Sequence, residues 1–95
     1  MILIVRNNET GRITAFDLSK ANYLSITKSN ELRICFDIDE PDIGIKLPEM
    51  NEEKRFALLI YLGTMQNKNT VEWLDRILKT LGVDVDEKKA EEKQN

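Results

Sequence analysis

The sequence predicts an α+β fold, in which a five-stranded antiparallel meander, flat or curled toward a barrel, is followed by a C-terminal helical hairpin. Three observations carry this prediction. Several short segments before Pro48 alternate apolar and polar residues with the period of a strand. The apolar period becomes helical near Asn51. Gly, Asn, Ser and Pro separate the segments, as turns require.

The opening run Ile2–Val5 is continuously apolar and rich in β-branched residues, which is typical of a strand buried on both faces. A turn at Asn7–Gly11 leads to a second strand over Arg12–Leu18. The first strand of a simple meander lies at an edge, where apolar surface invites association. We therefore expect that the sheet curls over this strand or that another chain pairs with it.

Three further strands are expected before the helices. In the middle strand, apolar and polar residues alternate strictly, which is typical of an antiparallel sheet with one face on the core and the other in solvent. Pro41 and Pro48 end the last two strands. The predicted strands are Tyr23–Thr27, Leu32–Ile38 and Ile43–Leu47; Leu32, Ile34, Phe36 and Ile38 share one face, opposite Arg33, Cys35 and Asp37.

The first helix is predicted over Asn51–Gln66. Asn51 is a favoured N-cap residue, and Glu52 and Glu53 follow it where the helix dipole favours negative charge. The stretch Phe56–Leu62 is apolar at all seven positions. A helix that rests on one sheet needs a single apolar stripe, so this helix carries a surplus of apolar surface.

The second helix is predicted over Asn69–Leu81. Asn69 followed by Glu72 resembles a capping box, and Gly82 is a favoured residue just beyond a helix end. The folded domain is expected to span residues 1–83. Residues 84–95 are almost entirely polar and charged, which predicts a disordered charged tail.

Composition narrows the class of protein. The chain has 95 residues, of which 33% are charged, with a formal net charge of −3 and no strongly basic segment. This charge pattern disfavours nucleic-acid binding. The single Cys35 permits no internal disulfide and suits the cytoplasm, and no apolar run is long enough to span a membrane. The abundance of Ile, Lys and Asn suggests a bacterial or phage protein from an AT-rich genome.

No catalytic, cofactor or metal site is expected, and the chain is predicted not to be an enzyme. It has no histidine and one cysteine, which removes Ser-His-Asp and Cys-His systems and the usual zinc sites. Asp37, Asp39, Glu40 and Asp42 superficially resemble a calcium loop. Pro41 and Asp42 occupy the fifth and sixth loop positions, where that motif requires an oxygen ligand and glycine. A solvated turn is preferred, with weak cation binding as the alternative.

The apolar surplus of the first helix has two interpretations. The helix lies between the sheet and the second helix, or part of it meets another chain. One of its faces carries Phe56, Leu59, Ile60 and Gly63, and another carries Leu58, Leu62 and Met65. Trp73 lies at the flank of the second helix, as a rim residue of the core or as an interface anchor. The candidate partner-contact residues are Leu58, Tyr61, Leu62, Met65, Trp73 and Ile77.

These observations predict a small non-catalytic protein-interaction or regulatory module that binds an unknown protein partner and forms a homo-oligomer. The alternative is a nucleic-acid-binding regulator. It would use the helical hairpin as a helix-turn-helix, against which the balanced charge of the second helix counts. It could also use basic residues on the sheet face, namely Arg6, Arg12, Lys20, Lys28 and Arg33.

Overall fold

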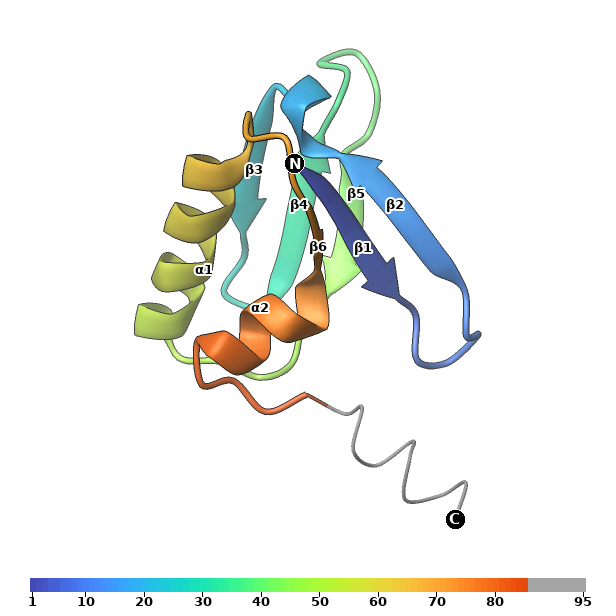
Figure 1. The fold of residues 1–95 in the computed structure, drawn as a ribbon. Coiled ribbons are helices and arrows are strands. Elements are labelled where there is room, and N and C mark those ends of the chain that lie inside the picture. The colour runs from blue at the N-terminus through green and yellow to red at the C-terminus, as the bar shows by residue number, and fades with distance from the viewer. Residues whose placement is uncertain (86–95) are drawn as a thin grey trace.

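The computed structural model describes residues 1–85 and confirms the α+β class (Figure 1). The expectation of one five-stranded meander is wrong. The described strands form two three-stranded sheets, in the orders β2-β1-β6 and β3-β4-β5, and neither closes into a barrel. In chain order the elements are β1 (Ile2–Arg6), β2 (Ile13–Asp17), the 3₁₀ helix η1 (Leu18–Lys20), β3 (Tyr23–Ile26), β4 (Glu31–Cys35), β5 (Ile43–Lys46), α1 (Glu52–Met65), β6 (Val71–Trp73) and α2 (Leu74–Thr80).

Strand β1 is the central strand of the first sheet, which corrects the prediction that it lies at an edge. It pairs antiparallel with β2, where Ile2 lies opposite Asp17, and parallel with β6, where Ile2 lies opposite Val71. The Ile2 amide donates to the Thr70 carbonyl over 2.8 Å. The two neighbouring strands satisfy the backbone of β1, but only one face of its side chains is fully covered: Leu3 is buried, whereas Ile2 and Ile4 on the other face are half-buried.

The predicted helical hairpin is also wrong. Residues 69–73 do not begin the second helix; they form the end of a turn and strand β6. Val71 and Trp73 are β-branched and aromatic residues that favour a strand, and pairing with β1 satisfies the backbone of this segment. Helix α2 therefore starts after Trp73, and its N-terminus has no side-chain cap.

The predicted C-terminus of the second helix is confirmed. Gly82 has a φ of +79°, the left-handed conformation that glycine adopts without strain. The Gly82 amide donates to the Lys79 carbonyl over 3.0 Å, and the Val83 amide donates to the Leu78 carbonyl over 2.9 Å. This pair of bonds is the Schellman arrangement, and Val83 is buried as that arrangement favours.

The second sheet is fully antiparallel, with β4 at its centre. Strand β4 ends at Cys35, three residues earlier than predicted, and Ile38 lies beyond it with 80% of its surface exposed. The inner face of β4 buries Leu32 and Ile34. The alternation predicted for this strand therefore holds only as far as β4 is paired.

The core lies between the two sheets and is completed by the helices. Helix α1 lies alongside β3, and α2 packs against β1 and β6 (Figure 1). Asn51 caps α1 as predicted, because its side chain accepts a hydrogen bond from the Lys54 amide over 2.9 Å. At the other end of α1, Gln66 Nε2 donates to the carbonyls of Leu18 and Ala21, which ties the helix to η1. Fully buried side chains come from every layer: Leu3, Leu18, Leu32, Ile34, Leu58, Leu62 and Leu78.

Neither α1 nor α2, the α-helices within residues 1–85, has the length and apolar character needed to cross a membrane. Most of the predicted tail, residues 86–95, lies outside the described residues. Val85, which the sequence assigned to the tail, is half-buried against the core.

Candidate protein-interaction surfaces

Three of the six candidate contact residues belong to the hydrophobic core. Leu58 and Leu62 are fully buried, and Ile77 is buried beside them. A partner cannot reach these side chains while the chain keeps this fold. Part of the apolar surplus of α1 is therefore used within the chain.

The other three candidates are half-buried and lie closer to the surface. The Tyr61 hydroxyl donates to Glu72 Oε1, and this hydrogen bond, with burial, raises the pKa of Tyr61 above its ordinary value. Tyr61 and Ile77 also meet at a small pocket of about 90 Å³ between α1 and α2. Met65 packs against the core, and the Trp73 ring lies 5.8 Å from the guanidinium carbon of Arg6, within cation–π range.

The exposed apolar residues of α1 are Phe56 and Ile60, with 64% and 53% of their surfaces exposed. They lie one turn apart, on a different face of the helix from the predicted contact residues. The sequence did show this face as a separate stripe. It could not show which of the two stripes would be buried in the core.

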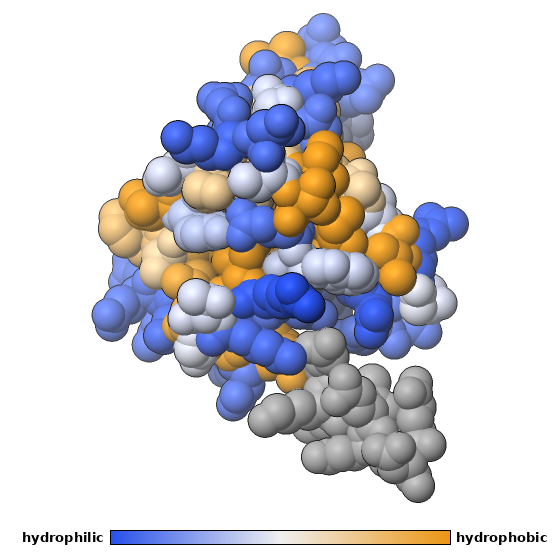
Figure 2. Space-filling view, in the orientation of Figure 1, coloured by the Kyte–Doolittle hydropathy of each residue, from blue (hydrophilic) through white to orange (hydrophobic). Residues whose placement is uncertain are grey.

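A second group of exposed apolar side chains lies on the first sheet, on the face turned away from the second sheet. Val71 and Ile13 are 68% and 54% exposed there. No described helix crosses this face, and Figure 2 shows hydrophobic surface gathered over β1 and β2. We call this surface the outer face of the first sheet; by strand alternation it holds Ile2, Ile4, Ile13, Ala15, Val71 and Trp73, with Arg6 and Asp17 at its corners.

The outer face of the second sheet is polar by contrast. Arg33 forms ion pairs with Glu31, at 2.5 Å, and with Asp42, at 3.6 Å. The Tyr23 hydroxyl donates to Asp42 over 3.3 Å, and Cys35 is buried on this sheet beside Tyr23. One outer face is thus covered by a polar network, while the other presents apolar side chains to solvent.

The acidic segment after β4 forms a turn. Asp37 Oδ1 accepts a hydrogen bond from the Asp39 amide over 3.0 Å, and Asp42 is engaged by Tyr23 and Arg33. Within residues 1–85, no group of three or more His, Cys, Asp or Glu side chains is arranged to hold a metal ion.

The basic residues of the nucleic-acid alternative come from separate parts of the fold. Arg6 and Arg12 lie at the β1–β2 hairpin, Lys20 ends η1, Lys28 lies in the β3–β4 turn, and Arg33 is ion-paired. Helix α2 has only seven residues, and β6 separates it from α1. The basic side chains therefore do not share one face, and α1 and α2 do not form a helix-turn-helix.

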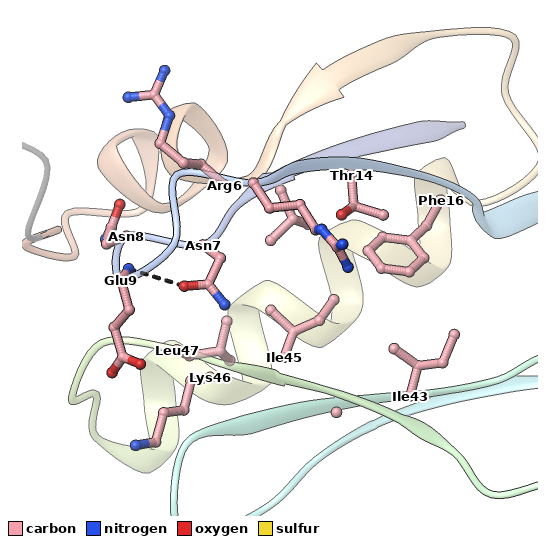
Figure 3. Close-up of a pocket in the computed structure, with 13 residues that line it drawn as sticks. Arg6, Asn7, Asn8, Glu9, Thr14, Phe16, Ile43, Ile45, Lys46 and Leu47 are labelled. Carbon is pink, nitrogen blue, oxygen red and sulfur yellow. Dashed lines mark hydrogen bonds between the residues drawn. The ribbon is translucent and has the colours of Figure 1, made fainter.

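A groove of about 480 Å³ lies between the two sheets, where the edge strands β2 and β5 face each other (Figure 3). Thr14 and Phe16 line it from β2, and Ile43 and Ile45 line it from β5. We call it the seam groove. The sequence carries no local signal for this groove, because it depends on how the two sheets are placed.

Comparisons with models of protein families, with characterised proteins and with solved structures found no match to this chain.

Proposed function

We propose that this chain is a non-catalytic interaction module of the cytoplasm that pairs with a second copy of itself through the outer face of the first sheet. The observation that supports this proposal is the apolar character of that face, which no described helix covers. Apolar surface that the fold leaves exposed is stabilised when a partner removes it from water. The outer face of the second sheet, by contrast, carries a network of ion pairs around Arg33.

The charges at the corners of this face favour a second copy as the partner. Arg6 lies opposite Ile13 and Asp17 lies opposite Ile2, so the two charges occupy diagonal corners. They are four residue steps apart along the sheet, or about 13 Å. A two-fold axis near Ile4 would place each Arg6 against Asp17 of the partner subunit, which is the self-complementarity that a symmetric dimer needs.

Asp17 is suited to this role because it remains ionised. Hydrogen bonds from the hydroxyl and the amide of Ser19 hold the pKa of Asp17 below its ordinary value. Arg6 is exposed and already positioned above Trp73. Both charges are therefore available to a partner at neutral pH.

The size of the face predicts a weak dimer. Five residues at about 3.4 Å by three strands at about 4.8 Å give a footprint of roughly 240 Å². Stable interfaces bury about 800 Å² of accessible surface on each partner. We therefore expect reversible association that is strongly concentration-dependent.

Sedimentation velocity between about 10 μM and about 1 mM tests this association. The wild-type sedimentation coefficient should rise across the series, and Ile13→Glu should abolish the rise. Ile38→Glu is the matched control, since Ile38 is equally apolar and more exposed but belongs to the loop after β4 and not to the first sheet. A monomer at every concentration, or an equal effect of the two variants, would refute self-association through this face.

A charge exchange tests the orientation of the two copies. Arg6→Glu and Asp17→Arg should each weaken the dimer, because each variant brings like charges together across the two-fold axis. The double variant should recover most of the association. Failure of the double variant to recover would contradict the arrangement, even if a dimer forms.

A further inference from the structure

We propose that the seam groove binds an extended peptide segment of another protein, which adds a strand to the free edge of β2. The segment has apolar side chains at alternate positions and at least one carboxylate. This site is separate from the outer face of the first sheet, since the groove lies on the side of the sheet that faces the core.

Hydrogen bonds at the ends of the β1–β2 hairpin show which backbone groups of β2 are free. The Leu18 amide donates to the Met1 carbonyl over 2.9 Å, and the Asn7 amide donates to the Arg12 carbonyl over 2.8 Å. In an antiparallel pair, hydrogen-bonded positions alternate with non-bonded ones. Thr14 and Phe16 therefore bond to β1, while the backbone groups of Ala15 point away from it.

The same reasoning applies to β5. The Leu47 amide donates to the Asn30 carbonyl over 2.8 Å, so Ile45 bonds to β4. The backbone groups of Gly44 and Lys46 then point away from β4. Strands β2 and β5 are not hydrogen-bonded to each other, so two free edges border one groove within the described chain. Free edges of this kind accept an added strand.

The side chains that line the groove select an alternating sequence. Phe16 and Ile45 belong to the inner faces of their sheets, and Ile43 is partly exposed to the groove. At one end, Phe16 stacks on Phe36 with 6.3 Å between ring centroids. Every second side chain of an added strand would point into this apolar lining. The groove volume lies within the range of about 300–1,000 Å³ that is usual for ligand sites.

Charge favours an acidic segment. The charged side chains at the groove are the cations of Arg12 and Lys46 and one carboxylate, Glu9, since the guanidinium of Arg6 lies over Trp73; this gives two positive charges against one negative. A carboxylate on the bound segment would be attracted to this rim. Residues 86–95 of this chain do not fit, because they hold one apolar residue, Ala90. The occupant is therefore a segment of another protein.

Selection from a random nine-residue peptide library displayed on phage tests the proposal, with the full chain as target. Enriched peptides should alternate apolar and polar residues and carry Asp or Glu. Synthetic copies labelled with fluorescein are then titrated by anisotropy. No enrichment, or enriched peptides that bind Ile43→Glu as well as the wild type, would overturn the proposal.

Two variants at one position test the strand addition itself. Ala15→Pro removes an amide that points toward the groove edge and should weaken binding about tenfold or more, whereas Ala15→Val keeps the amide and should bind within about twofold. Unchanged binding by Ala15→Pro would refute the pairing with β2.

Hydrogen exchange provides a measurement that needs no variant. Peptide should slow exchange of the Ala15 amide, while the Thr14 amide is already bonded to β1 and should change little. In the Ile13→Glu variant, which should not form the outer-face dimer, protection of Ala15 that appears on raising the protein concentration without peptide would assign the groove to a second copy and overturn the proposal. Ile13→Glu separates the two proposals, because it should abolish the dimer and leave peptide binding intact.

Discussion

Leu62→Ala distinguishes a core role from a contact role for the central apolar residues of α1. The side chain of Leu62 is fully buried among the core residues. Truncation removes three carbon groups at about 0.8 kcal/mol each, and the remaining cavity raises the loss to about 3–4 kcal/mol. The whole domain is expected to have about 5–14 kcal/mol of stability, so this loss is a large fraction.

Ile60→Ala on the same helix is the matched control. Ile60 is 53% exposed, so its truncation should cost less than about 1 kcal/mol. Urea and thermal unfolding of dilute protein, followed by fluorescence of the single Trp73, measure both variants. The midpoint temperature of Leu62→Ala should fall by about 12–30 °C. Similar stability of Leu62→Ala and the wild type, with a change only in association, would refute the core assignment.

Two glycines and one tyrosine give further expected outcomes. Gly82→Ala should destabilise the protein by about 1–2 kcal/mol, because φ is +79° at this position. Gly63→Ala should stabilise α1 by about 0.5–1 kcal/mol, because no neighbouring atom lies within 4 Å of the added Cβ. Chemical denaturation that ranks the two variants the other way would contradict this reasoning. Tyr23→Phe removes the other tyrosine, so that ultraviolet titration reports Tyr61 alone. In this variant Tyr61 should ionise above its ordinary pKa of 10.0, and adding Glu72→Gln should lower that pKa. The hydrogen bond between the two side chains should stabilise the protein below pH 10, and this stabilisation should be lost as pH rises through the folded-state pKa of Tyr61. An ordinary pKa in the parent, or no change in Glu72→Gln, would contradict the hydrogen bond.

Features set by a few consecutive residues were predicted well from the sequence. Asn51 caps α1 with its own side chain, and Gly82 adopts the left-handed conformation expected beyond a helix end. Five strands appear within three residues of their predicted ends. In each case the relevant chemistry is local, because a cap, a turn or an alternating run satisfies its own backbone groups within a short stretch.

The pairing of β6 with β1 could not be read from local sequence. Asn69 and Glu72 match a helix start, yet residues 71–73 form a strand, since a partner lies far away in the chain at Ile2–Ile4. The local signals conflict, since Val71 and Trp73 favour a strand, and the pairing with β1 decides between them. The sequence did indicate that Ile2–Val5 is not a simple edge strand, but it could not show that its second neighbour is β6 of the same chain.

The side of α1 that enters the core could not be predicted, for a related reason. The apolar surplus was assigned to α1, but Leu58 and Leu62 are buried in the core. Which stripe of a helix faces inward depends on where the sheets lie, and this information is absent from the spacing of residues within the helix. The exposed stripe is instead that of Phe56 and Ile60.

The position of β6 also determines which sheet face remains apolar and open. Because residues 71–73 extend the first sheet, α2 begins only after Trp73 and has seven residues. Its buried residues, Leu74, Ile77 and Leu78, all join the core between the sheets, so α2 cannot also cover the opposite face of β1. A longer helix starting at Asn69 would have left β1 without its parallel neighbour. The strand that completes the first sheet thus also adds Val71 and Trp73 to its uncovered apolar face, which links the unexpected topology to the proposed self-association.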